Sequence, residues 1–128
     1  MITAFYAGLC GVLLLGLYVR VSQRRLETKI GIGTGGDAVL EQRIRAHANF
    51  IECAPLALIF LYLFEQSATS PLYVHAFGAT FILARLAHAQ GISSNPGRSA
   101  GRFYGSLVTL LVMAGLTVAL LIDGLRSL

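Results

Sequence analysis

Four long apolar runs separated by short polar connections dominate the hydropathy pattern of this chain. The first is an uncharged run from Ile2 to Val19 that stops at Arg20. A helix rises about 1.5 Å per residue, so this run crosses most of a bilayer core about 30 Å thick. Later runs predict spans over about 44–64, 72–90 and 103–122, with turn-forming residues between them. We therefore expect one domain over residues 1–128, an all-α integral membrane protein folded as an antiparallel four-helix transmembrane bundle.

Composition agrees with a membrane protein. Apolar residues make up 55% of the chain and charged residues only 12%, whereas about a quarter of a soluble domain is charged. Lipid must therefore cover much of the surface. The net charge of +4 comes without a Lys/Arg-rich helix or an RNA-binding signature, so we expect no nucleic-acid partner.

The basic residues predict the orientation of the chain in the membrane. They gather around the first and third connections, and the second connection has no Lys or Arg. The first connection and its ends hold Arg20, Arg24, Arg25, Lys29, Arg43 and Arg45, and the third holds Arg98 and Arg102. Since connections rich in Lys and Arg stay in the cytoplasm, we expect both termini on the opposite side. Residues 1–5 contain no Lys or Arg, so we expect the first span to be retained and not cleaved as a signal peptide.

Polar residues mark one face of the second span. Glu41, Arg45, Asn49 and Glu52 fall within a stripe about 80° wide on a helix. Glu52 lies about 10 Å deeper than Arg45, where an isolated carboxylate is costly and needs a partner. The third span offers Arg85 and His88, which share a helix face at i, i+3. Because the two spans are antiparallel, we expect these residues to meet at one depth.

Two interpretations of this polar layer are open. Glu52 and Arg85 could form one ion pair that holds the bundle together. Alternatively, the excess of arginine, with Arg20, Arg98 and Arg102 edging the layer, suits a small anionic ligand entering from the cytosol. Ionisable groups inside a span favour the second interpretation, because their cost is usually repaid by function.

The same residues carry a resemblance. The string from Glu41 to Pro55 resembles the signature of the MAPEG family, the membrane-associated proteins of eicosanoid and glutathione metabolism. Ala84-Arg85-Leu86-Ala87-His88 resembles its third-helix motif, and Arg98-Ser99 with Arg102 its following connection. The resemblance implies a homotrimer in a bacterial inner membrane. Its three active sites would lie between subunits, open toward the cytoplasm, and bind glutathione as co-substrate.

Chemistry then assigns roles to the residues. Arg45, Arg85 and His88 can serve the two carboxylates of glutathione, Glu52 its ammonium group and Asn49 its amides. The resemblance implies that a loop arginine stabilises the thiolate, with Arg102 preferred as the catalytic residue and Arg98 as the alternative. Ser99, Tyr104 and Arg20 complete the expected glutathione-binding set, although Tyr104 at a span start could also be an interfacial anchor. Ala48, and Gln90 or Ile92, replace side chains typical of eicosanoid synthases, so we do not expect that activity.

The expected function is that of a membrane-bound glutathione transferase, with possible glutathione peroxidase activity, acting on lipophilic electrophiles or hydroperoxides. A non-catalytic lipid-binding scaffold of the same family and a small four-span transporter are the alternatives. A cation exporter of this size usually needs an acid within its first span, and here that span is uncharged.

The remaining motifs give weaker evidence of function. Gly31, Gly33 and Gly36 fit a nucleotide-binding pattern, but no strand precedes them, so they predict a flexible loop. Cys10 and Cys53 lack metal or disulfide spacing and are expected to be packed thiols, and we expect no metal site. His47 projects away from the polar stripe and His75 is expected to be structural. Gly101 and Gly105 form a G-x-x-x-G pair, which gives weak support for self-association.

Overall fold

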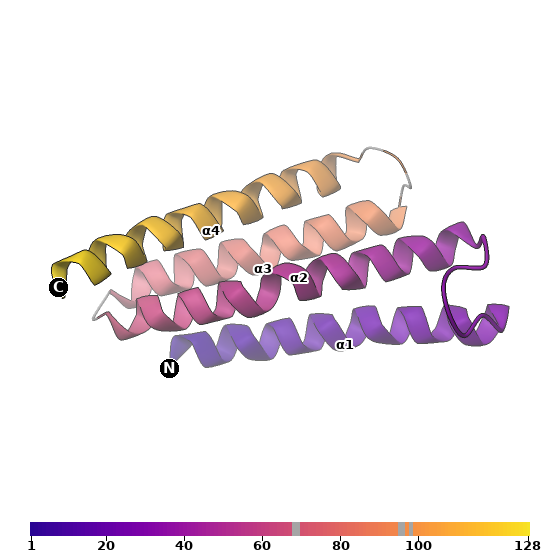
Figure 1. The fold of residues 1–128 in the computed structure, drawn as a ribbon, viewed down its shortest axis with the longest axis horizontal. Helices are drawn as coiled ribbons and strands as arrows, with labels where there is room; N and C mark the ends of the chain where they lie inside the picture. The colour runs from indigo at the N-terminus through magenta and orange to yellow at the C-terminus, as the bar shows by residue number, and fades with distance from the viewer. Residues whose placement is uncertain (68–69, 95–96, 98) are drawn as a thin grey trace.

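The computed structural model of the chain is an all-α bundle of four antiparallel helices. It describes residues 1–128 apart from 68–69, 95–96 and 98. The helices are α1 (Ile2–Thr28), α2 (Ala38–Gln66), α3 (Pro71–Ser94) and α4 (Ala100–Arg126), and the described residues contain no strand. Both termini lie at the end of the bundle that holds the α2–α3 connection (Figure 1). We name the opposite end, which holds the α1–α2 and α3–α4 connections, the basic end. The predicted up-and-down four-helix fold is confirmed.

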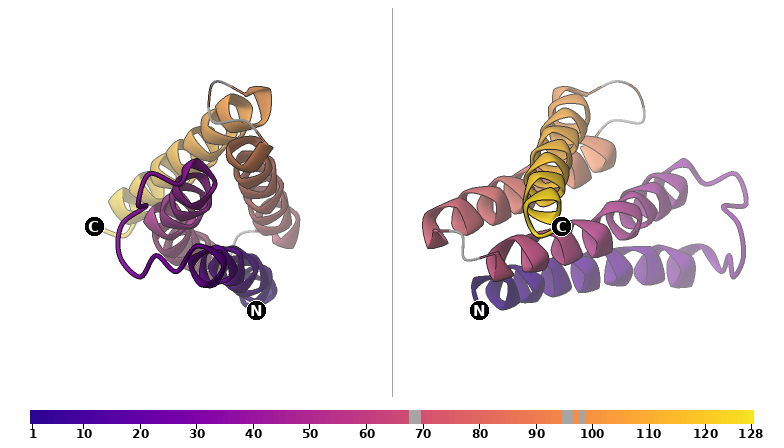
Figure 2. Two further views of the ribbon diagram at one scale, coloured as in Figure 1. Left: turned by 90° about the vertical axis from the view of Figure 1, so that its right-hand side faces the viewer. Right: turned by 60° about the vertical axis from the view of Figure 1, so that its left-hand side comes forward.

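The helices are stacked and do not close a ring. α2 and α3 lie in the middle, α1 packs on both of them, and α4 packs on α3 and α2. Within the described residues no Cα atoms of α1 and α4 come within 8 Å of each other, and the views in Figures 1 and 2 show the two helices on opposite sides of the central pair. Buried apolar side chains form one core between the helices, including Tyr6, Phe50, Leu61, Val74, Phe81 and Leu116.

Three of the helices, α1, α2 and α4, are long and apolar enough to cross a membrane. α3 does not meet the same measure, and it carries His75, Arg85 and His88 within its length. We place α3 in the membrane because it packs antiparallel between α2 and α4, which both meet this measure. The helices also run past the predicted spans, as α1 does from Val19 to Thr28, so these ends extend beyond the apolar layer.

Glycines bring α3 and α4 into close contact. A Cβ atom added at Gly105 would lie 2.7 Å from the carbonyl oxygen of Ala84, and one at Gly101 would lie 2.8 Å from that of Ala87. The G-x-x-x-G pair therefore packs α4 on α3 inside one chain. Gly91 faces the backbone of Arg102 from α3. α3 continues past the predicted end of the third span, at about residue 90, to Ser94.

Side chains from other helices hold the start of α1, which has no cap of its own. The Glu65 carboxylate accepts hydrogen bonds from the backbone N–H of Ile2 at 2.6 Å and of Thr3 at 2.8 Å. It thereby satisfies donors that a helix start leaves free. His75 lies 3.0 Å from the Tyr6 hydroxyl, a contact between α3 and α1 that fits its expected structural role.

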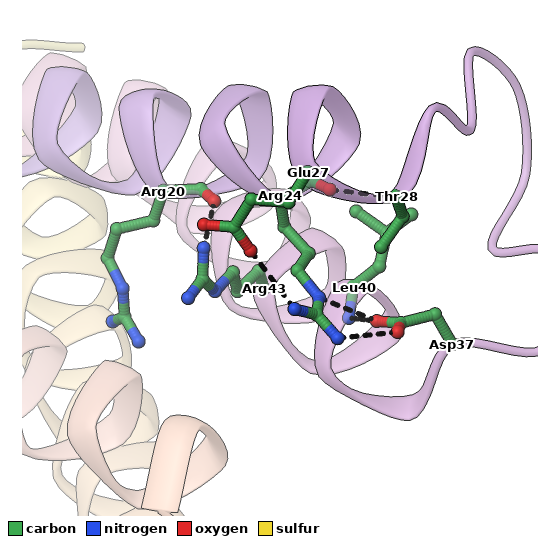
Figure 3. Close-up of polar contacts among 7 residues, drawn as sticks. All are labelled: Arg20, Arg24, Glu27, Thr28, Asp37, Leu40 and Arg43. Atoms are coloured by element: carbon green, nitrogen blue, oxygen red, sulfur yellow. Dashed lines mark hydrogen bonds and ion pairs between the residues drawn. The ribbon is translucent and has the colours of Figure 1, made fainter.

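The α1–α2 connection is a glycine turn fastened by arginines (Figure 3). Arg24 binds Asp37 with two hydrogen bonds, of 3.1 and 2.7 Å, and Asp37 caps α2 by accepting from the Leu40 N–H at 2.6 Å. The Arg24 guanidinium and this N–H hold the pKa of the Asp37 carboxyl below its usual value. Gly33, Gly35 and Gly36 have positive φ, which glycine adopts at little cost. The predicted loop is confirmed.

Candidate functional site

A polar pocket of about 290 Å³ lies at the basic end, between α2, α3 and α4. We name it the polar pocket. α2 provides most of its wall, α3 two residues and α4 one: Ala38, Glu41, Gln42, Arg45, Asn49 and Glu52, then His88 and Ile92, then Arg102. It lies where the Asp37 cap begins α2 and where the glycine contacts hold α4 against α3.

The four residues that we expected to share one face of the second span all line this pocket. Glu41, Arg45, Asn49 and Glu52 are spaced by three or four residues, so a continuous helix brings them into one row. Arg45 and Glu52 are exposed and make no hydrogen bond or ion pair with any other described residue. Charged side chains of both signs therefore stand in the pocket without a partner among the described residues.

The ion pair between Glu52 and Arg85, one of the two interpretations of the polar layer, is absent from the described residues. Arg85 is only 3% exposed and does not line the pocket. Its Nη1 donates instead to Asn49 Oδ1 at 2.7 Å and to Cys53 Sγ at 3.1 Å. Glu52 is on the open side of α2, while Arg85 is buried at its back. Arg85 thus holds Asn49 in the wall but does not itself line the pocket.

His88 and Arg102 complete the pocket from the other side. His88 is 4% exposed, held where α3 packs closely on Gly105. Arg102 is exposed and also borders a second, open groove of about 660 Å³ on α4, which we name the α4 groove. The α4 groove is lined by Ser99, Ala100, Arg102, Phe103 and Ser106. Arg102 therefore stands between a polar space and a more apolar one.

Three expected ligand residues lie elsewhere in the single chain, and a fourth cannot be placed. Arg20 donates to Ser93 Oγ at 3.0 Å beside an α1–α3 groove. Ser99 caps α4 and donates to the Gly91 carbonyl at 2.9 Å, and Tyr104 is 62% exposed with its ring edge-on to Phe103. Arg98 lies outside the described residues.

Sequence reasoning missed three residues of the wall, Ala38, Gln42 and Ile92. Ala38 lies one turn before Glu41 on the same face of α2, so extending the helical periodicity of the polar stripe by one turn would have found it. His47 faces Tyr18 of α1, with the ring centroids 6.0 Å apart, which agrees with its expected turn away from the stripe. The described residues contain no group of three His, Cys, Asp or Glu side chains able to hold a metal ion.

The chemistry of the polar pocket suits a small zwitterion with extra negative charge. Arg45 and Arg102 offer guanidinium forks for carboxylates, and Glu41 and Glu52 offer acceptors for an ammonium group. Asn49, held by Arg85, presents an amide for hydrogen bonds with a peptide backbone.

Comparison with known proteins gives the same family as the motifs. The model of the MAPEG family matches residues 3–122, which is nearly the whole chain. The inner membrane protein YecN of Escherichia coli strain K12 is 31% identical over 91 residues, covering 71% of this chain and 70% of YecN. The same values hold for YecN of Escherichia coli O6:H1 strain CFT073. With its four-helix fold and the residues of its second and third helices in place, the chain belongs to the MAPEG family.

Proposed function

We propose that this protein is a membrane-bound glutathione transferase that also reduces hydroperoxides with glutathione. The observation that carries the proposal is the polar pocket, where the side chains of Arg45, Glu52 and Arg102 meet without partners in the part of the chain that the structure describes. A structural ion-pair network would have matched these charges with one another. Membership of a family concerned with glutathione and eicosanoid metabolism supports glutathione as the ligand.

Glutathione matches the charges of the pocket group by group. It has a carboxylate for Arg45, a thiolate for Arg102, one ammonium group for Glu52, and amides for Asn49. His88 adds a further polar contact from α3. The volume of about 290 Å³ is near the lower end of the roughly 300–1,000 Å³ that ligand pockets enclose.

This small volume supports a site completed by a second copy of the chain. The polar pocket opens to the surface, and Arg20 lies on a different face of the bundle, beside the α1–α3 groove. Arg20 can therefore serve a glutathione molecule only from a neighbouring copy. We propose a homotrimer with three such sites, located in the inner membrane, as YecN is named, with the basic end in the cytoplasm.

Arg102 is the proposed catalytic residue because it borders both spaces. Its guanidinium stabilises the glutathione thiolate, the species that attacks. A lipophilic electrophile enters the α4 groove from the membrane, the sulfur forms a bond to its reactive carbon, and the leaving group departs with the electron pair. With a hydroperoxide, the thiolate takes the terminal oxygen and releases an alcohol, and a second glutathione then gives the disulfide and water. Holding both reactants beside Arg102 supplies proximity and electrostatic stabilisation.

The test is thermal unfolding of the detergent-purified full chain with glutathione, with S-methylglutathione and with an analogue that lacks the γ-glutamyl amine. A ligand of the native state raises the unfolding midpoint. We expect glutathione and S-methylglutathione to raise it, and the analogue to raise it less, because Glu52 has lost its ammonium partner. No rise at millimolar glutathione would overturn the proposal.

A further inference from the structure

His88 is a buried histidine whose ring has no hydrogen-bond partner among the described residues. It is only 4% exposed, and neither of its ring nitrogens bonds another described group. Buried polar side chains are normally satisfied by a hydrogen bond, so an unpartnered imidazole needs an explanation. His88 lines the polar pocket, and a ligand held there can supply the missing partner.

The charged groups around His88 favour its neutral form. Arg85 lies one turn before it on α3, and Arg102 of α4 lines the same pocket. Three charged side chains of α2 line that pocket too: Glu41, Arg45 and Glu52. Neither of these acids forms an ion pair or a hydrogen bond with His88 in the described structure. α1 also packs on α3, but its Arg20 donates to Ser93 and not to His88. A neutral imidazole keeps one nitrogen free to accept a proton.

The close contact between α3 and α4 brings His88 and Arg102 together. A Cβ atom added at Gly105 would lie 2.8 Å from the Cβ atom of His88, so the two helices meet at this residue. One turn further along α3, Gly91 lies against the backbone nitrogen of Arg102. Both side chains line the polar pocket. A thiol bound beside Arg102 therefore has an unpartnered imidazole as a neighbour.

We propose that His88 is the catalytic base that takes the thiol proton of glutathione, while Arg102 stabilises the thiolate. This inference rests on the proposed function, because it concerns the thiol of that substrate. The S–H bond breaks, its electron pair stays on the sulfur, and the proton moves to the free nitrogen of His88. The thiolate is then the anion that His88 lacks among the described residues, so imidazolium and thiolate balance each other.

The proton on His88 has a destination in both proposed reactions. In hydroperoxide reduction, the sulfur bonds to the terminal oxygen, the O–O bond breaks, and the alkoxide takes the proton from His88 to leave as an alcohol. In conjugation to an electrophile that loses an anion such as a halide, the proton passes from His88 to water at the open side of the pocket. His88 is neutral again after either reaction, so no further co-reactant is needed.

The test follows the thiol proton when glutathione binds to the detergent-purified full chain. Ultraviolet absorbance reports the thiolate, and a pH indicator in weak buffer reports protons released to water. The wild type should form the thiolate with little proton release, because His88 keeps the proton. In His88→Gln, thiolate formation should be at least about 10²-fold slower, the lower end of what a positioned base contributes, although glutathione still raises the unfolding midpoint. His47→Gln is the matched control, because His47 faces Tyr18, and should behave as the wild type.

Nitrogen NMR of the histidine-labelled wild type makes the test independent of any substitution. Glutathione should convert one of the three imidazoles of the chain to the doubly protonated form. S-methylglutathione has no thiol proton and should convert none.

Two results would overturn the inference and leave the transferase proposal standing, provided that glutathione raises the midpoint of the wild type. One is thiolate formation at the wild-type rate in folded His88→Gln, and the other is a set of imidazoles that glutathione leaves unchanged. If glutathione gives the wild type neither a thermal shift nor a thiolate, the transferase proposal is overturned together with the role of His88.

Discussion

The α1–α2 connection and the polar pocket lie at the same end of the bundle and are both rich in arginine, yet their charges are used differently. In the connection, Arg24 is bound by Asp37 and Glu27 (Figure 3). Arg25 donates to the carbonyls of Ile30 and Gly33. In the pocket, the side chains of Arg45 and Arg102 make no such contact among the described residues.

The difference separates arginines that build the fold from those that await a ligand. Paired charges at a surface contribute little stability individually, but here they fix the turn and the start of α2. Unpaired charges in a pocket add no ion-pair stabilisation to the fold, and they attract a ligand that carries the opposite charges. The comparison therefore predicts that substitutions in the pocket change binding and turnover, and that substitutions in the connection change stability.

The largest expected effect is on turnover in Arg102→Ala. Loss of one group that stabilises transition-state charge typically lowers kcat by about 10²–10³-fold. We expect such a loss in conjugation of glutathione to a lipophilic electrophile, while glutathione still raises the unfolding midpoint. Arg98→Ala is the companion variant. Full activity in Arg102→Ala together with a large loss in Arg98→Ala would transfer the catalytic role to Arg98.

A smaller effect is expected on glutathione affinity in Glu52→Gln. Removing the acceptor of the ammonium group should weaken binding about tenfold, which corresponds to about 1.4 kcal/mol. Titration calorimetry should also show that the variant no longer distinguishes glutathione from the analogue that lacks the amine. Glu27→Gln, at an acid already paired with Arg24, is the matched control and should bind glutathione normally. Equal weakening in both variants would remove the distinction between the two regions.

In the connection, Asp37→Ala should lower stability without changing binding. The substitution removes both the cap of α2 and the two hydrogen bonds from Arg24. We expect the unfolding midpoint to fall by a few degrees and the rise that saturating glutathione causes to stay the same. A lost response to glutathione in folded Asp37→Ala would show that the connection belongs to the binding site.

The smallest expected effect is a dependence of stability on acid pH. Because the pKa of Asp37 is lowered in the folded chain, its contribution is fully present above its unfolded pKa of about 3.9. It is lost as the pH falls from there through the folded pKa. Midpoints measured between neutral pH and about pH 3 should therefore converge for the wild type and Asp37→Asn. A constant difference over that range would contradict this link.

Helix periodicity made one part of the site predictable. Glu41, Arg45, Asn49 and Glu52 form a row whenever the second span is helical, whatever surrounds it. The partner of each side chain was not predictable in the same way. The sequence placed Glu52 and Arg85 at one depth but not on facing surfaces, and Asn49 and Cys53 occupy the Arg85 side of α2.

The same limit applies to Arg20 and to the glycine pair. Connection charges give the depth of Arg20, but only the packing of α1 on α2 and α3 gives its direction around the bundle. The glycine motif indicated close helix contact without naming the helix, which is α3 of the same chain. The overall fold was more accessible, because spans and turns depend on local composition alone.

The separation of α1 from α4 also bears on how the chain is made. Helices adjacent in sequence pack on one another, so the α1–α2 hairpin with its Arg24 and Asp37 contacts can assemble before α4 has been synthesised. The polar pocket cannot, because Arg102 arrives with the last helix. A nascent chain would therefore acquire its anchoring hairpin early and a complete polar pocket last, so that a partly synthesised protein would not yet bind the ligand proposed for it.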